Sequence, residues 1–180
     1  MKQLLDSAIC IRPLIETDIP KITHRYCFPW STPEKTHLLW KTYYREQIEG
    51  IRTVGIIERN DEILGYGSLL RKSECLSFLN QGIPEINAIW IDEEYRRCGL
   101  GRALIVWHEN LAYQEGYRQI GLGVGLYADY GAAQQLYFRL GYTPDGNGVT
   151  YKGHPVTPCQ SYPIDDELIL WLIKKIDAVL

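Results

Sequence analysis

Residues 95–104, YRRCGLGRAL, contain two adjacent arginines and then, after a cysteine, two glycines that are separated by one residue. The apolar run INAIWI at 86–91 precedes them and is typical of a strand, and the run that begins at Gly101 is typical of an amphipathic helix. Free N–H groups and the dipole at a helix N-terminus attract anions, and glycine lets the backbone approach a ligand closely. The pattern therefore predicts a loop that holds a phosphate or a pyrophosphate.

Two other interpretations of this turn remain open from the residues alone. The dinucleotide-binding fingerprint, G-x-G-x-x-G, has its first two glycines at Gly99 and Gly101, but Leu104 stands where the third belongs. A simple tight turn with solvated arginines would need no ligand at all. The residue types favour an anion without identifying the molecule that carries it.

The elements that position this turn follow from hydrophobic periodicity and from Pro and Gly punctuation. Strands are predicted at 8–14, 52–58, 63–71, 85–91, 119–127, 148–153 and 167–176, and helices at 16–26, 32–50, 101–116 and 131–141. The second and third strands form a predicted hairpin around RNDE. The strand before the turn, the helix after it and the next strand form a predicted parallel crossover, so the sheet is mixed and flanked by helices.

The composition is that of an ordinary globular protein. The chain has 180 residues, 46% of them hydrophobic and 23% charged, and its formal net charge is −3. The length predicts a single domain, residues 1–180, and the small net charge predicts no binding to nucleic acid. Five cysteines without a CxxC pair, histidines without metal-ligand spacing and the lack of a run of about 18 apolar residues predict a cytoplasmic protein with no metal and no membrane span.

A second motif, the run AAQQLYFRLGY, follows the turn by about 35 residues. Together the two motifs resemble those of the GCN5-related N-acetyltransferase family, [Q/R]-x-x-G-x-[G/A] and N-x-x-A-x-x-L-Y-x-x-x-G-[F/Y]. The matching residues are Arg96, Gly99 and Gly101, and then Ala133, Leu136, Tyr137, Gly141 and Tyr142. The resemblance covers about residues 8–143, and departs where Tyr130 replaces an asparagine and Asp92 a common proline. It implies an α/β (α+β) fold with a mixed, mostly antiparallel twisted sheet, a central parallel crossover and flanking helices.

The resemblance implies acetyl-CoA as the cosubstrate. The N–H groups of residues 97–102 would hold its pyrophosphate, and the backbone of residues 89–91 would pair with its pantetheine amides, so that the strands at 85–91 and 119–127 splay apart. Alternate glycines at 121, 123 and 125 would leave one face of the latter strand open, or would let it pack tightly beneath a helix. The predicted cofactor-binding residues are Ile89, Trp90, Ile91, Arg96, Arg97, Cys98, Gly99, Leu100, Gly101, Arg102 and Tyr130.

Two residues are predicted to be catalytic. Tyr137 matches the family's general acid, which protonates the leaving thiolate, although an aromatic residue on this helix also fits a place in the core. Glu85 matches the position at which several members keep a general base; a solvated glutamate, with a water chain as base, is the alternative. A backbone N–H near Ile91 would stabilise the developing oxyanion.

The resemblance implies that the acetyl group passes to a primary amine of a small molecule or a peptide. Aromatic residues of the first two helices could receive such an amine by cation–π contact or could belong to the core; these are Tyr26, Phe28, Trp30, Trp40, Tyr43 and Tyr44. The apolar C-terminal strand could pair across a homodimer. A non-catalytic acyl-CoA-binding module and a dinucleotide-dependent oxidoreductase are the alternative functions.

Overall fold

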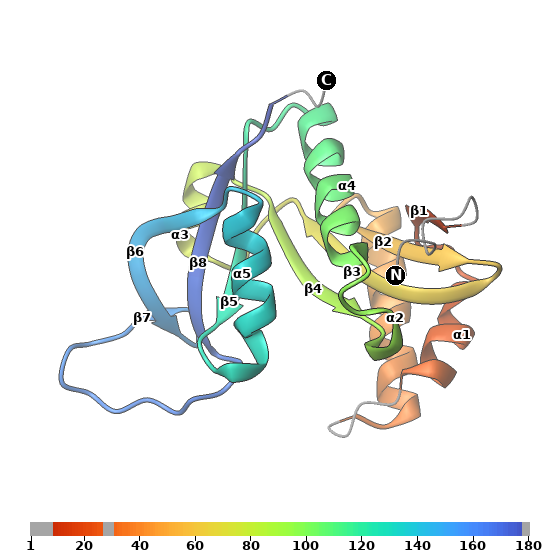
Figure 1. The fold of residues 1–180 in the computed structure, drawn as a ribbon, viewed down its shortest axis with the longest axis horizontal. Helices are drawn as coiled ribbons and strands as arrows, with labels where there is room; N and C mark the ends of the chain where they lie inside the picture. The colour runs from red at the N-terminus through yellow and green to blue at the C-terminus, as the bar shows by residue number, and fades with distance from the viewer. Residues whose placement is uncertain (1–8, 27–30, 178–180) are drawn as a thin grey trace. The chain divides into compact units, whose positions relative to one another are not determined.

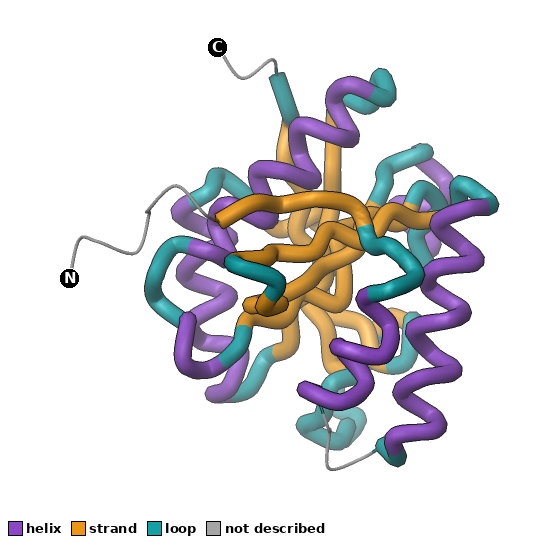
Figure 2. The backbone as a smooth tube through the Cα atoms, turned by 90° about the vertical axis from the view of Figure 1, so that its right-hand side faces the viewer, coloured by secondary structure: helices purple, strands orange, loops and turns teal. Residues whose placement is uncertain are grey.

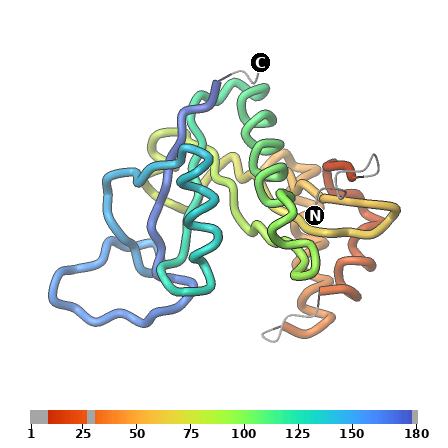
Figure 3. Tube along the Cα trace, viewed as in Figure 1, coloured from red at the N-terminus to blue at the C-terminus, as the bar shows by residue number. Residues whose placement is uncertain are grey.

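The computed structural model describes residues 9–26 and 31–177. Contacts within the chain divide it into two compact units, Met1–Leu70 with Ala88–His108 and Arg71–Asn87 with Glu109–Leu180. Strand β4 (Glu85–Ile91) and helix α4 (Leu100–Gln114) contribute residues to both units. Figure 1 labels the helices and strands, and Figure 3 follows the chain from red to blue. Each unit has buried hydrophobic residues of its own.

The first unit is built on β1, β2, β3 and the second half of β4, which are neighbours in that order. β1 pairs with β2, and β2 with β3, in both cases antiparallel. The elements that lie wholly in this unit are β1 (Ile9–Pro13), α1 (Asp18–Arg25), α2 (Pro33–Ile48), β2 (Arg52–Arg59), β3 (Glu62–Leu70) and the 3-10 helix η1 (Glu93–Tyr95). Their order confirms the predicted strand, two helices and hairpin.

Local signals in the sequence explain where these elements begin and end. The Thr32 side chain caps α2 by accepting a hydrogen bond from the N–H of Lys35 (3.3 Å), and Pro33 stands in the first turn. Asn60 and Asp61 have positive φ angles (50° and 68°) and form the two-residue turn between β2 and β3. Polar residues that tolerate this conformation therefore fix the hairpin.

Helix α4 packs against the first unit's strands over two glycines. A Cβ atom at Gly55 would lie 3.0 Å from the His108 ring, and one at Gly67 would lie 3.1 Å from Leu104, so larger residues would push the helix away. His108 is fully buried there, with Nδ1 2.9 Å from the carbonyl oxygen of Leu104. Close approach of α4 to the strands thus places an ionisable ring in an apolar interior.

The second unit contains the predicted parallel pair. β5 pairs parallel with the first half of β4 and antiparallel with β8, and β6 pairs antiparallel with β8 and β7. The elements that lie wholly in this unit are α3 (Leu76–Gln81), β5 (Gln119–Gly125), η2 (Ala128–Tyr130), α5 (Gly131–Arg139), β6 (Thr143–Tyr151), β7 (His154–Pro155) and β8 (Leu168–Lys175). Figure 2 distinguishes these helices and strands by colour.

The mixed, mostly antiparallel sheet with flanking helices confirms the predicted fold class. Helix α3 and the short strand β7 were not predicted, and β6 begins at Thr143 rather than at residue 148. β8 lies between β5 and β6, so its backbone is paired on both sides and the suggestion that this strand pairs across a dimer is wrong. Along residues 9–26 and 31–177, no helix is long and apolar enough to cross a membrane.

The alternate glycines of β5 are covered by aromatic rings of the second unit. A Cβ atom at Gly121 would overlap the ring of Phe78 on α3, and one at Gly125 would lie 2.5 Å from the ring of Tyr130. Tight packing is therefore the correct interpretation of these glycines, and the open face proposed for a pantetheine arm is wrong. Phe78 is fully buried and lies edge-on to Trp171 (ring centres 5.4 Å apart).

Candidate active site

The predicted anion-binding turn lies in the first unit, between the end of β4 and the start of α4. The N–H of Asp92 donates to the carbonyl of Leu64 on β3 (2.9 Å), which fixes the point where the chain leaves β4. The chain then passes through Arg97 (φ 61°) and Gly99 (φ 85°) before α4 begins at Leu100. Glycine adopts this conformation freely, whereas for arginine it costs about 1–2 kcal/mol. Backbone strain of this kind is characteristic of ligand-binding turns.

The first turn of α4 presents backbone N–H groups that the helix does not use. The helix's first hydrogen bond runs from the N–H of Ala103 to the carbonyl of Gly99 (3.0 Å). The N–H groups of Leu100, Gly101 and Arg102 precede this bond, so they have no acceptor within the helix, and the positive end of the helix dipole lies beside them. An anion the size of a pyrophosphate suits this arrangement.

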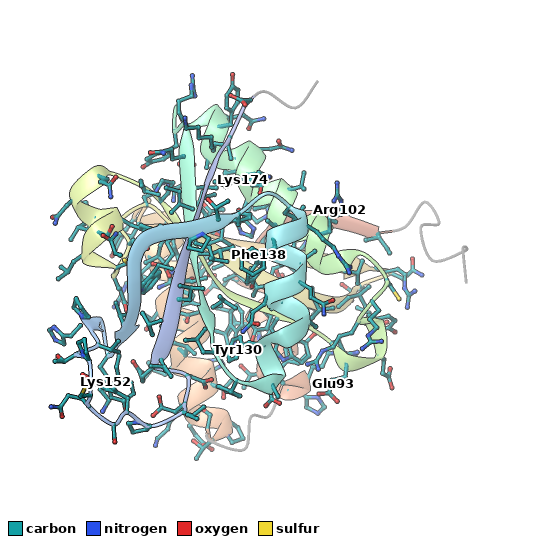
Figure 4. The ribbon with its side chains drawn as sticks, turned by 60° about the vertical axis from the view of Figure 1, so that its left-hand side comes forward. Glu93, Arg102, Tyr130, Phe138, Lys152 and Lys174 are labelled. Carbon is teal, nitrogen blue, oxygen red and sulfur yellow. The ribbon has the colours of Figure 1, made fainter. Side chains whose placement is uncertain are left out.

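The side chains of the turn add positive charge that reaches solvent. Its exposed arginines are Arg96, Arg97 and Arg102. The Nε of Arg96 donates to the carbonyl of Ile91 (3.1 Å), which folds that side chain back along the turn. Cys98 is half-buried, and its Sγ lies 3.5 Å from the carbonyl oxygen of Arg96, so it lines the turn. Figure 4 labels Arg102 at the start of α4 and Glu93 in η1.

The residues predicted to bind the pantetheine arm follow a break in β4. Pairing of β4 with β5 comprises Glu85 with Gly121 and Ile86 with Leu122. Ala88 then has a φ of 51°, a conformation that alanine rarely adopts, so nothing in the sequence marks this break. Residues 89–91 come after it and are half-buried.

Glu85 lies in the second unit and is buried. Its side chain is 6% exposed, and the Ser73 hydroxyl donates a hydrogen bond to its carboxylate. Ser73 in turn accepts a hydrogen bond from the N–H of Cys75 (2.9 Å), which fixes the hydroxyl. The alternative in which this glutamate is solvated is therefore wrong. A buried carboxylate with a fixed donor is an environment in which a general base can operate.

Tyr137 lies on α5 and is 7% exposed. Burial raises the pKa of its hydroxyl from 10.0 to about 12, because desolvation disfavours the charged phenolate. Its ring lies 6.2 Å from that of Tyr142. Tyr137 is thus both a packed aromatic and a protonated donor, and the two interpretations of this residue are compatible.

A buried polar group that the sequence analysis missed lies beside these tyrosines. The Lys174 ammonium donates to both carboxylate oxygens of Glu109 (2.8 Å each), and its Nζ lies 5.5 Å from the centre of the Tyr142 ring. Burial, followed by the Glu109 charge, raises the pKa of Tyr142 well above its ordinary value. Two features of the sequence could have indicated this ion pair. Lys174 lies within an otherwise apolar strand, and Glu109 lies beside the apolar face of a helix.

Tyr130, which replaces the family's asparagine, stands before the first residue of α5 (Figure 4). Its hydroxyl donates to Asp166 Oδ1 (2.9 Å), and the hydroxyl of Tyr127 donates to the same oxygen. Burial, followed by this hydrogen bond, raises the pKa of Tyr130. The Tyr130 hydroxyl therefore fixes Asp166, two residues before β8 begins, and this role was not predicted.

Of the aromatic residues predicted for an acceptor pocket, Tyr26 and Trp40 are buried in the core of the first unit. Tyr43 and Tyr44 pack partly buried against that core, and the Arg52 guanidinium lies 3.9 Å from the centre of the Tyr43 ring. The Arg52 guanidinium thus occupies the face of the Tyr43 ring to which an amine acceptor could have bound. The two remaining candidates, at positions 28 and 30, lie outside the described residues. Within the described ranges, no cluster of His, Cys, Asp and Glu could hold a metal ion.

Comparison with known proteins identifies the family. Residues 19–142 match the model of the acetyltransferase (GNAT) family, and no curated protein matches the chain significantly. The match spans both motifs and more than half of the sequence. The chain therefore belongs to the acetyltransferase (GNAT) family, which confirms the resemblance and decides against the dinucleotide-binding interpretation of Gly99 and Gly101.

Solved structures share the fold over nearly the whole chain. YncA from Salmonella typhimurium, solved with acetyl-CoA, has a TM-score of 0.66 at 19% identity and covers 97% of both chains. Spermidine N-acetyltransferase from Vibrio cholerae, solved with CoA and spermine, has a TM-score of 0.65 at 16% identity, covering 95% and 97%. The ribosomal-protein-S18-alanine N-acetyltransferase from Escherichia coli has a TM-score of 0.63 at 22% identity, covering 95% and 96%. These similarities show the fold.

Proposed function

We propose that this protein is an acetyl-CoA-dependent N-acetyltransferase whose acceptor is a primary amine of a small molecule or a peptide. The observation that carries the proposal is the turn at 96–102, where unused N–H groups of α4, exposed arginines and two positive-φ residues come together. This combination suits the pyrophosphate of a coenzyme. The family match supports acetyl transfer as the chemistry that this binding serves.

The two catalytic residues would move protons during direct transfer. As the amine attacks the thioester carbon, a C–N bond forms and the C–S bond breaks. Tyr137, which is protonated at neutral pH and whose pKa burial raises to about 12, would give its proton to the leaving thiolate and recover one from solvent. Glu85 would accept the proton that the amine releases, directly or through water, and a backbone N–H near Ile91 would stabilise the carbonyl oxygen.

The acceptor would be recognised by its amine. Among proteins of the same fold, the names of two specify spermidine and the alanine of a ribosomal protein as acceptors. These examples support the two acceptor classes in the proposal, a polyamine-like small molecule and a peptide N-terminus. Because Tyr26 and Trp40 are used in the core, the acceptor would be held by residues other than this pair.

The proposal treats residues 1–180 as one N-acetyltransferase domain. The continuity of β4 and α4 through both units supports this treatment. A cytoplasmic location accords with the free thiols at Cys10, Cys75, Cys98 and Cys159.

The proposal is tested by two measurements on the purified protein. Calorimetric titration with coenzyme A is expected to give binding, and thiol release from acetyl-CoA is expected with at least one amine of a panel. The panel contains spermidine, simple alkyl amines and peptides that begin with alanine. Binding of coenzyme A without turnover on any amine would instead identify a non-catalytic acyl-CoA-binding module. Absence of binding would contradict both functions.

A further inference from the structure

The segment between β4 and the anion-binding turn is held by charged side chains from three other elements of the first unit. α1 contributes an arginine, β2 a second arginine and β3 a glutamate; Figure 1 labels these three elements. We call the five residues of this network the loop clamp: Arg25, Arg59, Glu62, Asp92 and Tyr95. Neither family motif includes any of them, and only Asp92 stands out in the sequence, as a departure from a common proline.

One half of the loop clamp is an ion pair between Arg25 and Asp92. The Nε and Nη2 atoms of Arg25 donate to the same Asp92 oxygen (3.0 and 2.7 Å), and Nη1 lies 3.0 Å from Glu62 Oε1. The other Asp92 oxygen accepts a hydrogen bond from the N–H of Glu94 (3.2 Å), at the start of η1. Asp92 therefore connects α1 to the segment that leads into the turn. Its side chain is only 14% exposed, which limits screening by solvent.

The other half of the loop clamp holds Tyr95, the last residue of η1. Arg59 Nη2 donates to the Tyr95 hydroxyl (3.0 Å), and the Arg59 guanidinium lies 4.9 Å from the centre of the Tyr95 ring. The same hydroxyl lies 3.3 Å from a carboxylate oxygen of Glu62. Tyr95 is therefore fixed through its ring and its hydroxyl, one residue before Arg96 begins the turn.

A proline at position 92 would not preserve this arrangement. The N–H of Asp92 donates to the carbonyl of Leu64, and proline has no N–H to replace it. The chain instead uses a carboxylate at this position, and Arg25 neutralises it. Without Arg25, the Asp92 carboxylate would add its charge to those of the exposed Glu93 and Glu94 and would repel the anion that the turn is proposed to hold.

We propose that Arg25 and Asp92 are positioning residues, which set the shape of the 96–102 turn and keep the loop clamp free of net negative charge. The proposal deepens the function proposed above, because the anion concerned is the coenzyme's pyrophosphate. The network contains two arginines and two carboxylates, so its charges cancel. Loss of Arg25 alone removes a restraint and leaves a net negative charge, whereas loss of both partners removes the restraint and restores neutrality.

The test compares Arg25→Met, Asp92→Asn and the double variant with wild type. Asparagine keeps an oxygen that can accept the hydrogen bond from Glu94, so Asp92→Asn removes the ion pair but retains the start of η1. Lys21→Met is the matched control, because Lys21 lies on the same helix and pairs with the exposed Asp61. Coenzyme A affinity is measured by calorimetry, and backbone amide exchange of residues 96–102 is measured without ligand.

Arg25→Met is expected to weaken coenzyme A binding about tenfold, and adding Asp92→Asn to it is expected to recover about threefold of that loss. The KM for acetyl-CoA should follow the affinity while kcat at saturation stays unchanged. Amide exchange in the turn should accelerate in all three variants but not in the control. Recovery of affinity on a second substitution would not follow from a merely structural role.

Coenzyme affinity and amide exchange within about twofold of wild type in both single variants would overturn the inference. So would a double variant weaker than Arg25→Met. If Arg25→Met does not fold, Asp92→Asn alone decides through its exchange rates. Wild type that binds no coenzyme A would contradict the proposed function, whereas unchanged exchange in the variants would contradict the loop clamp, so the two failures are distinct.

Discussion

The turn at 96–102 and the surroundings of Tyr137 differ in how far their polar groups are exposed to solvent. In the turn, the arginines are exposed, and the first N–H groups of α4 have no acceptor within the helix. Around Tyr137, the side chain is buried and desolvation raises its pKa to about 12. The difference is that helix N–H dipoles can attract an anion while they remain exposed, whereas burial of Tyr137 disfavours its charged form.

Tyr137→Phe gives the largest expected effect, because it removes the proton donor while keeping the buried ring. The value of kcat is expected to fall by about 100-fold or more, with coenzyme A affinity unchanged. Steady-state kinetics and calorimetry measure the two quantities. Tyr113→Phe, on α4 in the second unit, is the control and should retain full kcat. If Tyr137→Phe keeps more than half of the wild-type kcat, Tyr137 is a core residue only.

In the first unit, burial shifts the pKa of His108 in the direction opposite to that of Tyr137. Burial lowers the pKa of this imidazole to about 4, from an ordinary value of 6.5. Between these values the unfolded chain binds a proton that the folded chain does not, so stability is fully present above pH 6.5 and is lost as the pH falls. The free energy of unfolding is expected to drop by about 2 kcal/mol between pH 7.5 and 5 through this group.

Urea denaturation at the two pH values measures this loss. His108→Gln is expected to lower stability at pH 7.5 but to remove most of the difference between the two pH values. His154→Gln is the control, because His154 is exposed and should leave that difference intact. Equal pH dependence in the two variants would mean that His108 titrates normally.

Gly99→Ala tests the backbone conformation of the turn. Gly99 has a φ of 85° and no atom within 4 Å of an added Cβ, so conformation rather than space requires glycine there. Alanine at this φ is expected to cost about 1 kcal/mol of stability and to weaken coenzyme A binding about tenfold. Gly131→Ala is the control, because Gly131 has a φ of −56° and open space around it. Unchanged affinity in Gly99→Ala would separate the turn from coenzyme binding.

Tyr142→Phe has the smallest expected effect and concerns the polar group beside Tyr137. The Tyr142 hydroxyl is buried and has no hydrogen-bond acceptor in good geometry within the described part of the chain. Removal of this hydroxyl is expected to leave the free energy of unfolding unchanged or to raise it by up to about 1 kcal/mol. A loss of more than about 1 kcal/mol would mean that Glu109 accepts a hydrogen bond from this hydroxyl in solution.

The sequence predicted the features of the fold and the site that depend on residues close together in the chain. The turn at Gly99 and the hairpin at Asn60 and Asp61 are local, so residue type and spacing are enough to locate them. The motif around Tyr137 likewise lies within one helix. The sequence alone therefore predicted a turn with clustered arginines at the start of a helix.

The rest depends on contacts between residues far apart in the chain. Phe78 covers Gly121, and Ser73 donates to Glu85, but neither pairing has a signature in spacing. The open glycine face on β5 was a wrong alternative because Phe78 lies on a helix that the sequence did not indicate. The pairing of β8 on both sides likewise follows from the whole sheet, and an apolar strand alone does not indicate its neighbours.

The central claim, that N–H groups of the turn hold the pyrophosphate, is tested most directly by amide NMR with coenzyme A. The largest chemical-shift changes are expected at residues 98–102, and inorganic pyrophosphate is expected to reproduce them while pantetheine is not. Gly99→Ala should reduce these changes. Shifts confined to residues outside 96–102, or equal shifts with pantetheine, would contradict the claim.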